Sequence, residues 1–482
     1  MHRLVLLALL AAAGPLQAES SLELEDCRIS AGPGSPGISA QCGWFERPIN
    51  PDQPEDGTLE LRVAVVPALS LEPALDPFVP IAGGPGQSSI QFYAGWSYAF
   101  EAVRQHRDML LIDQRGTGQS APMVCEMDED ALAGDYSPEE TARLTRACLT
   151  ALPYDPRYFT TSVAVEDIEA VRKALGYDAL NVYGASYGTR VAQHYARRYP
   201  ETTRTVTIDG VVPPQLPLGP DIAIQSQRAL DSVFSRCAEE PGCNAEFPDL
   251  ADDFTTLHDR LSEEPVLVTF HHPVTGKLRT EDIGVDHLNG AIRLLLYNPR
   301  TIALLPLMIS DAADGNYAPL AAQFFAIAES LSADLNIGMH NAVMCTEDEP
   351  FVDDNDIDRE QLQATYMGPL MFDAIEAMCS VWPAGVLDDN LLQPLATDLP
   401  VLLLSGEADP ITPADYAEEA LVEMTNKAHL VLDDQGHGVA GVGCMPRVLA
   451  TFVDTATPPE RPDCLDRAFV MPFFLDYSGP AP

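Results

Sequence analysis

A serine flanked by two glycines constrains the fold of this chain more than any other feature. The pentapeptide Gly184-Ala185-Ser186-Tyr187-Gly188 directly follows 180–183, an apolar run typical of a buried strand. A turn sharp enough to join a strand directly to a helix leaves no room for side chains beside the serine, and its strained backbone exposes the hydroxyl. The pattern alone is weak, because an ordinary loop can carry the same residues.

The rest of the chain supplies the strands and helices that such a turn requires. Short apolar runs alternate with amphipathic stretches, which predicts an α/β fold with a mostly parallel sheet and helices on both faces. We expect strands at 59–67, 77–82, 109–113, 180–183, 205–209, 400–404 and 429–432, and helices at 163–175 and 190–198.

A long helical block interrupts this alternation. Residues 213–397 are mainly helical in period, with one hairpin expected at 266–270 and 276–280. We therefore predict a first core part at 19–212, a mainly helical cap at 213–397 inserted between two core strands, and a second core part at 398–482 that carries an acid loop and a base loop.

The first residues have the pattern of a secretory signal. Residues 1–18 contain the basic Arg3, an apolar stretch and a small residue, Ala18, at a plausible cleavage position. The apolar stretch is too short for a spanning helix. These features predict an exported protein, periplasmic or extracellular, without stable membrane insertion.

Ten cysteines fit an oxidising compartment. Ten cysteines allow many pairings, and we expect sequence neighbours to join. Their spacing does not resemble a metal site, and we predict neither a metal nor a cofactor. The expected disulfides are Cys27-Cys42, Cys125-Cys148, Cys237-Cys243, Cys345-Cys379 and Cys444-Cys464.

The charge balance restricts the partners. Lys and Arg total 28 against 72 Asp and Glu, a net charge of −44. Phosphate binding needs a basic stripe, so a nucleic-acid partner is disfavoured. The excess of negative charge either keeps the surface soluble or attracts cationic substrates such as peptides with free amino termini.

An acid and a base follow later strands in the order expected for a nucleophilic serine. Asp409 follows the strand at 400–404, and His437 follows the strand at 429–432. A serine hydroxyl needs a base to take its proton, and the base needs a carboxylate that orients it. We predict Ser186, Asp409 and His437 as the catalytic residues. Asp209 is the alternative acid, whereas His194 and His340 are expected to be structural or substrate-facing.

A second glycine-rich loop completes the expected site. An oxyanion needs two backbone N–H groups, one from the residue after the nucleophile and one from a loop after an early strand. Tyr187 and Gly84 are the candidates, while Pro85 has no N–H. No Gly-Lys-Ser/Thr follows this loop, which argues against nucleotide binding. The later segment 113–120 is interpreted as a structural turn.

Five motifs together resemble the proline iminopeptidase and tripeptidyl aminopeptidase family of α/β-hydrolases. They are 83–86, 113–120, 184–188, 406–409 and 436–438, in this order. The large cap, signal and cysteines resemble the tripeptidyl branch more closely. Ala82 stands where proline iminopeptidases carry a histidine, which puts a strict preference for amino-terminal proline in doubt.

The resemblance implies a secreted serine aminopeptidase that acts on peptides with a free amino terminus. It also implies that Glu347 and then Asp348, in the cap, are candidates for binding the substrate amine, although both could be surface charges beside a disulfide. The same residues could serve an esterase or thioesterase, because a fold does not fix its substrate. A catalytically inactive binding protein is the third possibility.

Overall fold

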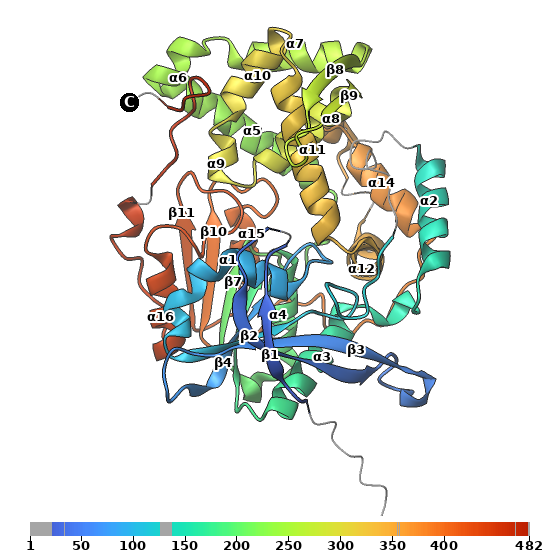
Figure 1. Ribbon diagram of the computed structural model, residues 1–482, viewed down its shortest axis with the longest axis vertical. Helices are drawn as coiled ribbons and strands as arrows, with labels where there is room; N and C mark the ends of the chain where they lie inside the picture. Colours follow the sequence, from blue (N-terminus) through green and yellow to red (C-terminus); the bar gives the residue numbers. More distant parts are fainter. Residues whose placement is uncertain are drawn as a thin grey trace, which may run out of the picture.

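Nine strands form one twisted sheet with helices on its faces in the computed structural model of the chain (Figure 1). The structure describes residues 22–32, 34–125, 137–353, 355, 357–467 and 469–480. The predicted signal at 1–18 lies outside these residues. The strand order is β1-β2-β3-β5-β4-β6-β7-β10-β11. The strands are β1 Glu25–Ile29, β2 Ile38–Pro48, β3 Thr58–Val66, β4 Ala74–Ile81, β5 Arg107–Ile112, β6 Leu180–Ala185, β7 Thr203–Asp209, β10 Val401–Gly406 and β11 Lys427–Leu432.

The sheet is parallel from β5 to β11 and antiparallel at its other edge. The sequence analysis places the first strand at 59, but β1 and β2 precede it. Gly43 and several polar residues interrupt the apolar alternation of β2, so that its period is a poor signal of a strand. All parallel strands end at the same edge, and the loops that leave this edge carry the candidate site.

Helices cover both faces of the sheet because each presents an apolar stripe to it. The central strand β6 is almost entirely buried, as a parallel strand covered on both sides requires. The helices on the sheet are α1 Ser89–Arg104, α3 Thr161–Leu175, α4 Tyr187–Arg198, α15 Ala414–Ala420 and α16 Met445–Thr455. Helix α2 Pro138–Ala151 instead packs against α14 Leu370–Cys379 (Figure 1).

The segment between β7 and β10 forms the layer above the sheet in Figure 1. We call this segment, residues 210–400, the cap. Its hairpin pairs β8 Val266–His271 with β9 Leu278–Ile283. Its helices are α5 Ile222–Glu239, α6 Pro241–Glu246, α7 Leu250–Glu263, α8 Val285–Leu295, α9 Pro299–Ile302, α10 Leu305–Ala313, α11 Ala318–Asp334, α12 Ile337–Val343, α13 Arg359–Gln363 and α14 Leu370–Cys379.

The cap contains two differently anchored parts. Helices α5 to α11 surround an apolar cluster of their own, whereas Met339 of α12, Cys345 and Trp382 belong to the cluster beneath the sheet helices. The second part is therefore packed on the core, close to the elbow, although the sequence suggests one insertion.

The C-terminal segment departs from the expected core part at 398–482. It leaves the sheet and ends against the cap (Figure 1). Phe473 is buried in the cap cluster beneath the guanidinium of Arg236, 4.1 Å from its ring centroid. Phe474 N–H donates to the Ala303 carbonyl at 2.9 Å. Apolar burial of this phenylalanine draws the tail to the cap.

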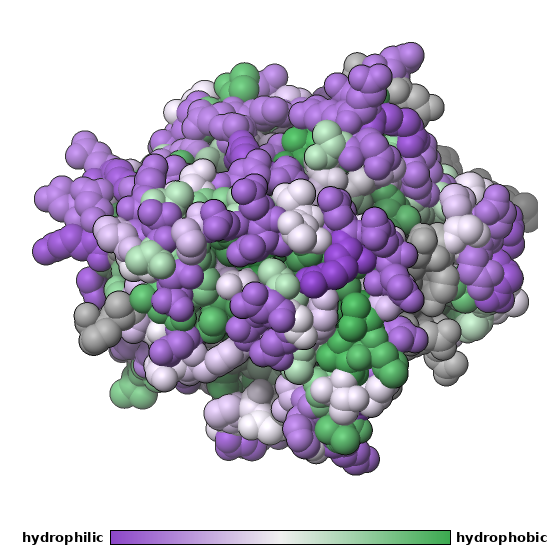
Figure 2. All heavy atoms as spheres, turned by 90° about the horizontal axis from the view of Figure 1, so that it is seen from above, coloured by the Kyte–Doolittle hydropathy of each residue, from purple (hydrophilic) through white to green (hydrophobic). Residues whose placement is uncertain are grey.

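Five disulfides join the sequence neighbours Cys27-Cys42, Cys125-Cys148, Cys237-Cys243, Cys345-Cys379 and Cys444-Cys464. Each closes a loop of the chain and thereby restricts its unfolded state. No helix in the described ranges is long and apolar enough to cross a membrane. The face seen from the cap side is mainly hydrophilic, with small apolar areas between the polar ones (Figure 2).

The segment 113–120 braces the loops around β5. The buried Asp113 carboxylate accepts hydrogen bonds from Ser88 Oγ, Ile90 N–H and Gln119 N–H. Arg115 is completely buried and binds Asp167 through two bonds of 2.7 and 2.9 Å. Its Nη1 donates to the backbone carbonyls of Ile49 and Tyr158, and Nη2 donates to that of Pro48 as well. These contacts agree with a structural turn.

Replacing Asp167 by alanine should destabilise the fold strongly. The substitution leaves the Arg115 charge buried without its carboxylate, and breaking a buried pair in this way costs about 3–5 kcal/mol. Denaturant unfolding measures the loss. Asp415→Ala, which removes a long, exposed contact to Arg228, is the control and should cause no comparable change. Equal stability of the Asp167 variant and wild type would contradict the bracing role.

Candidate active site

Ser186 occupies the sharp turn between β6 and α4. Its backbone has φ 54° and ψ −126°, a left-handed conformation that is strained for a residue with a side chain. A Cβ on Gly184 would overlap the Gly188 carbonyl, and a Cβ on Gly188 would lie 2.7 Å from the Ala82 carbonyl oxygen. Both glycines are therefore required for the helix to approach the strands so closely.

Asp409 and His437 meet through a direct hydrogen bond. His437 Nδ1 lies 2.8 Å from Asp409 Oδ2. The other carboxylate oxygen accepts the backbone N–H groups of Ile411 and Thr412, and the Thr412 hydroxyl donates to Oδ2 at 2.8 Å. The carboxylate is thus fixed by its own turn, and it can orient the imidazole with Nε2 free for other contacts.

Asp209, the alternative acid, has a different role. It is buried, and its carboxylate accepts the N–H groups of Val439 and Ala440 at 2.9 Å and the Tyr183 hydroxyl at 2.8 Å. It therefore holds the backbone that follows His437, whereas Asp409 holds the imidazole itself.

The local charges favour the protonated form of His437. Burial lowers the pKa of His437, but the Asp409 carboxylate and its hydrogen bond, with a smaller contribution from Asp209, outweigh burial and raise the pKa above its usual value. Such a base is well suited to accept a proton and to carry the resulting charge.

Ser186 and His437 both lie at the end of β7. The Ser186 N–H donates to the Asp209 carbonyl at 2.9 Å. The next residue, Gly210, packs against the imidazole, where an added Cβ would lie 2.8 Å from His437 Cε1. The chain thus brings the three residues predicted from sequence to one edge of the sheet.

The glycine-rich loop after β4 lies directly against Ser186. A Cβ on Gly83 would lie 2.8 Å from the Ser186 Cβ, so a side chain there would displace the serine. Gly84 follows with φ 106°, a conformation that glycine adopts readily. Tyr187 is the first residue of α4, where a backbone N–H has no partner within the helix. The loop therefore lies beside the serine through Gly83, and the oxyanion role of Gly84 and Tyr187 stays a prediction.

The cap reaches the site at two points that the sequence did not reveal. Asn336, at the start of α12, donates its N–H to the Gly86 carbonyl at 3.0 Å. Tyr297, which follows α8, accepts the His437 N–H on its carbonyl at 2.8 Å and sets its ring 5.2 Å from the imidazole centroid. No local motif could predict Tyr297, because the contact joins segments 140 positions apart.

Of the two other histidines, His194 is buried and His340 is partly exposed. His194 Nε2 lies 2.8 Å from Asp388, and burial lowers the pKa of His194. His340 lies in α12 against the backbone of Pro85, and burial lowers its pKa to about 4. Both are neutral at neutral pH and support the structure around the site.

Glu347 and Asp348 lie in a closed cluster behind the elbow. Both side chains are fully buried in a π-helical turn at Met344–Asp348. Glu347 accepts the Thr161 N–H at 2.7 Å and the Thr161 hydroxyl at 2.8 Å, and Thr161 also bonds the Tyr187 hydroxyl. Arg190 of α4, which the sequence analysis missed, lies 2.8 Å from Asp348. These carboxylates are thus internal and not surface charges.

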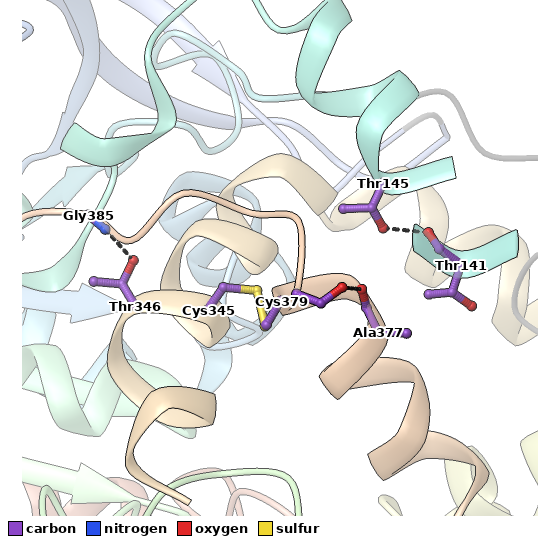
Figure 3. Close-up of a disulfide and its surroundings, with 8 residues drawn as sticks. Thr141, Thr145, Cys345, Thr346, Ala377, Cys379 and Gly385 are labelled. Atoms are coloured by element: carbon purple, nitrogen blue, oxygen red, sulfur yellow. Dashed lines mark hydrogen bonds between the residues drawn. A yellow bond between two sulfur atoms is a disulfide. The ribbon is translucent and has the colours of Figure 1, made fainter. Parts of the chain in front are cut away.

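The Cys345-Cys379 disulfide anchors this turn to α14, as Figure 3 shows. Beside it, the Thr346 hydroxyl accepts the Gly385 N–H at 2.9 Å. Burial raises the pKa of Glu347 to about 7, against the opposing charge of Arg190. The amine-binding role of Glu347 and Asp348 stays a prediction, because their bonds in this structure are to protein groups.

Within the described ranges, no group of three or more His, Cys, Asp or Glu side chains lies together in a way that could hold a metal ion. The chemistry of the site is therefore considered from the serine, the imidazole and the carboxylates.

Comparison with known families agrees with this arrangement. Residues 76–235 match the family described as alpha/beta hydrolase fold, and residues 365–464 match the family described as TAP-like protein. The first match contains the glycine-rich loop and Ser186, and the second contains Asp409 and His437. The chain has the α/β-hydrolase fold, and its similarity to serine proteases and aminopeptidases shows a serine hydrolase.

Several of its relatives are peptidases by name. The serine protease Hip1 of Mycobacterium tuberculosis is 26% identical over 468 residues, with 88% of this chain and 87% of that protein covered. The tripeptidyl aminopeptidase of Streptomyces lividans is 25% identical over 214 residues, 41% of this chain and 39% of that one. The proline iminopeptidase of Aeromonas sobria is 27% identical over 183 residues, with coverage of 37% and 39%.

Two matched substitutions separate the roles of the two buried aspartates. Asp409→Asn removes the charge that holds the imidazole and should lower kcat/KM by about 10⁴-fold, as expected for a triad acid. Asp209→Asn keeps a carbonyl oxygen for the backbone N–H groups and should cost roughly tenfold or less, the size of one lost neutral hydrogen bond. Steady-state kinetics on an ester measure both. The opposite order would make Asp209 the acid.

Proposed function

We propose that this protein is an exported serine aminopeptidase that cleaves peptides with a free amino terminus by acyl transfer. The observation that carries the mechanism is the 2.8 Å bond between His437 and Asp409 at the edge of the sheet where Ser186 occupies its strained turn. The peptidase names of the relatives support the substrate class.

In the proposed reaction, Ser186 Oγ attacks the scissile carbonyl while His437 Nε2 takes the hydroxyl proton. Asp409 stabilises the imidazolium, and the N–H groups of Tyr187 and Gly84 bind the oxyanion. His437 then gives the proton to the leaving amine as the C–N bond breaks. Water attacks the acyl-enzyme by the same sequence of proton transfers, which releases the amino-terminal product and restores Ser186.

The cluster behind the elbow supports recognition of the substrate amine. Two carboxylates, Glu347 and Asp348, face one arginine, Arg190, so the cluster has an excess of acidic groups beside α4. An approaching ammonium would favour the ionised form of Glu347 and could replace its bond to Thr161. The five disulfides and the amino-terminal pattern support export.

Acetylation of the substrate amine tests the proposal. We expect kcat/KM for an acetylated peptide to fall by roughly tenfold or more relative to the free amine, because a charge-assisted hydrogen bond contributes about 1.5–3 kcal/mol. Glu347→Gln should reduce this preference, mainly through KM, and should leave hydrolysis of a small neutral ester unchanged. Glu360→Gln on the exposed helix α13 is the charge-matched control.

Equal cleavage of free and acetylated peptides would overturn the aminopeptidase proposal. Efficient ester hydrolysis without peptide cleavage would instead favour an esterase. Equal loss of ester and peptide activity in the Glu347 variant would give this residue a structural role.

A further inference from the structure

A polar face of α8, continued by Tyr297 in the turn after the helix, leads away from the catalytic histidine. Asn289, Arg293 and Tyr297 follow one another at intervals of four residues, so their side chains are neighbours along one face. All three are partly exposed, whereas Leu288, Ile292 and Leu295 on the other face are buried in the cap cluster. The polar face is thus turned away from the cap core.

Tyr297 fixes one end of this face at His437. The His437 N–H donates to the Tyr297 carbonyl at 2.8 Å, and the two rings meet edge to face with centroids 5.2 Å apart. The next side chain along the face, Arg293, sets its guanidinium 6.0 Å from the Tyr297 ring centroid. Arg293 therefore lies within about 11 Å of the imidazole, a distance that roughly three extended residues span.

A second contact relates Arg293 to the oxyanion loop. The positive charge of Arg293 contributes to the low pKa of His340, to which burial makes the largest contribution. His340, a residue of the cap, in turn lies against the backbone of Pro85. Arg293 thus lies near the base, and its charge acts on a cap residue that contacts the glycine-rich loop.

Two buried side-chain atoms of this face, in the described part of the chain, lack protein partners. Among the described residues, Arg293 forms no ion pair, and its Nε is buried without a hydrogen bond. Asn289 Oδ1 is also buried without a partner. Buried polar groups are nearly always paired, and an unpaired arginine stands out in a chain with 72 acidic residues against 28 basic ones. A guanidinium fits a carboxylate through two parallel hydrogen bonds.

We propose that Arg293 binds a carboxylate of the substrate on the leaving-group side of the scissile bond. This inference rests on the proposed peptidase function. His437 delivers its proton to the leaving amine, so the leaving group lies against the imidazole. The face of α8 that carries Arg293 begins beside this imidazole, at Tyr297. The carboxylate is either the carboxyl terminus of a short leaving peptide or an acidic side chain within it.

Paired peptides test this specificity. Oligoalanines of two to eight residues with free amino termini are prepared as free acids and as carboxyl-terminal amides. A second set, all amidated, carries glutamate or glutamine at successive positions. The products of wild type, Arg293→Gln and Arg300→Gln are followed by mass. Arg300 is exposed, follows Tyr297 closely and has the same charge, so it serves as the control.

We expect wild type to cleave the free acids with a kcat/KM roughly tenfold or more above the amides when the leaving group is about one to three residues long. Arg293→Gln should bring this ratio close to one, whereas Arg300→Gln should keep it. Arg300→Gln should hydrolyse 4-nitrophenyl acetate at the wild-type rate, and the ester rate of Arg293→Gln corrects its peptide rates for any change at the serine and its base. A preference seen only for glutamate over glutamine would identify an acidic side chain as the ligand.

Three results would overturn the inference. Wild type could cleave acids and amides equally and also fail to distinguish glutamate from glutamine. Arg293→Gln could keep the wild-type preference. Wild type could hydrolyse the ester but none of the peptides, which would overturn the peptidase proposal and this inference with it.

Discussion

The carboxyl end of β7 positions the two halves of the site, the turn with Ser186 and the loop with His437, relative to each other. There the Asp209 carbonyl accepts the Ser186 N–H, while the Asp209 carboxylate accepts the N–H groups of Val439 and Ala440. One buried residue thereby joins the elbow, encoded before the cap, to the histidine loop, encoded after it. The parallel pairing of β7 with β10 aligns the Asp409 turn at the same edge.

The cap is coupled to this edge through backbone contacts. Tyr297 accepts a hydrogen bond from the residue that acts as the proposed base, and Asn336 donates to the glycine-rich loop. The cap thus contacts both the base and the expected oxyanion loop. A change in the position of α8 or α12 would therefore alter the site directly, which gives the cap a physical means of selecting substrates.

Much of the core was predictable from sequence because local patterns encode it. The strands β6, β7, β10 and β11 lie within a few residues of the apolar runs expected for them, since buried parallel strands are continuous apolar segments. The antiparallel strands β1 and β2 were missed, because their alternation is interrupted. The sequence also showed no sign that Phe473 packs on the cap, because its position depends on a distant contact with Arg236.

The residues of the candidate site also fall into two groups, those that a local motif marks and those that only contacts between distant segments reveal. Ser186, Asp409 and His437 each belong to a short motif after a strand, so the sequence could place them. Arg190, Tyr297 and the structural role of Asp209 depend on contacts between segments far apart in the chain, and no local motif carries that information. The sequence also could not show that Glu347 and Asp348 are buried, because acidic residues are usually exposed.

The claim on which this account depends is that Ser186 is the nucleophile activated by His437. A fluorophosphonate probe, followed by peptide mass spectrometry, tests it directly. We expect one probe molecule per chain, attached to Ser186, with no labelling of Ser186→Ala and much slower labelling of His437→Ala. Labelling of another serine, or unchanged labelling of the Ser186→Ala protein, would contradict the claim.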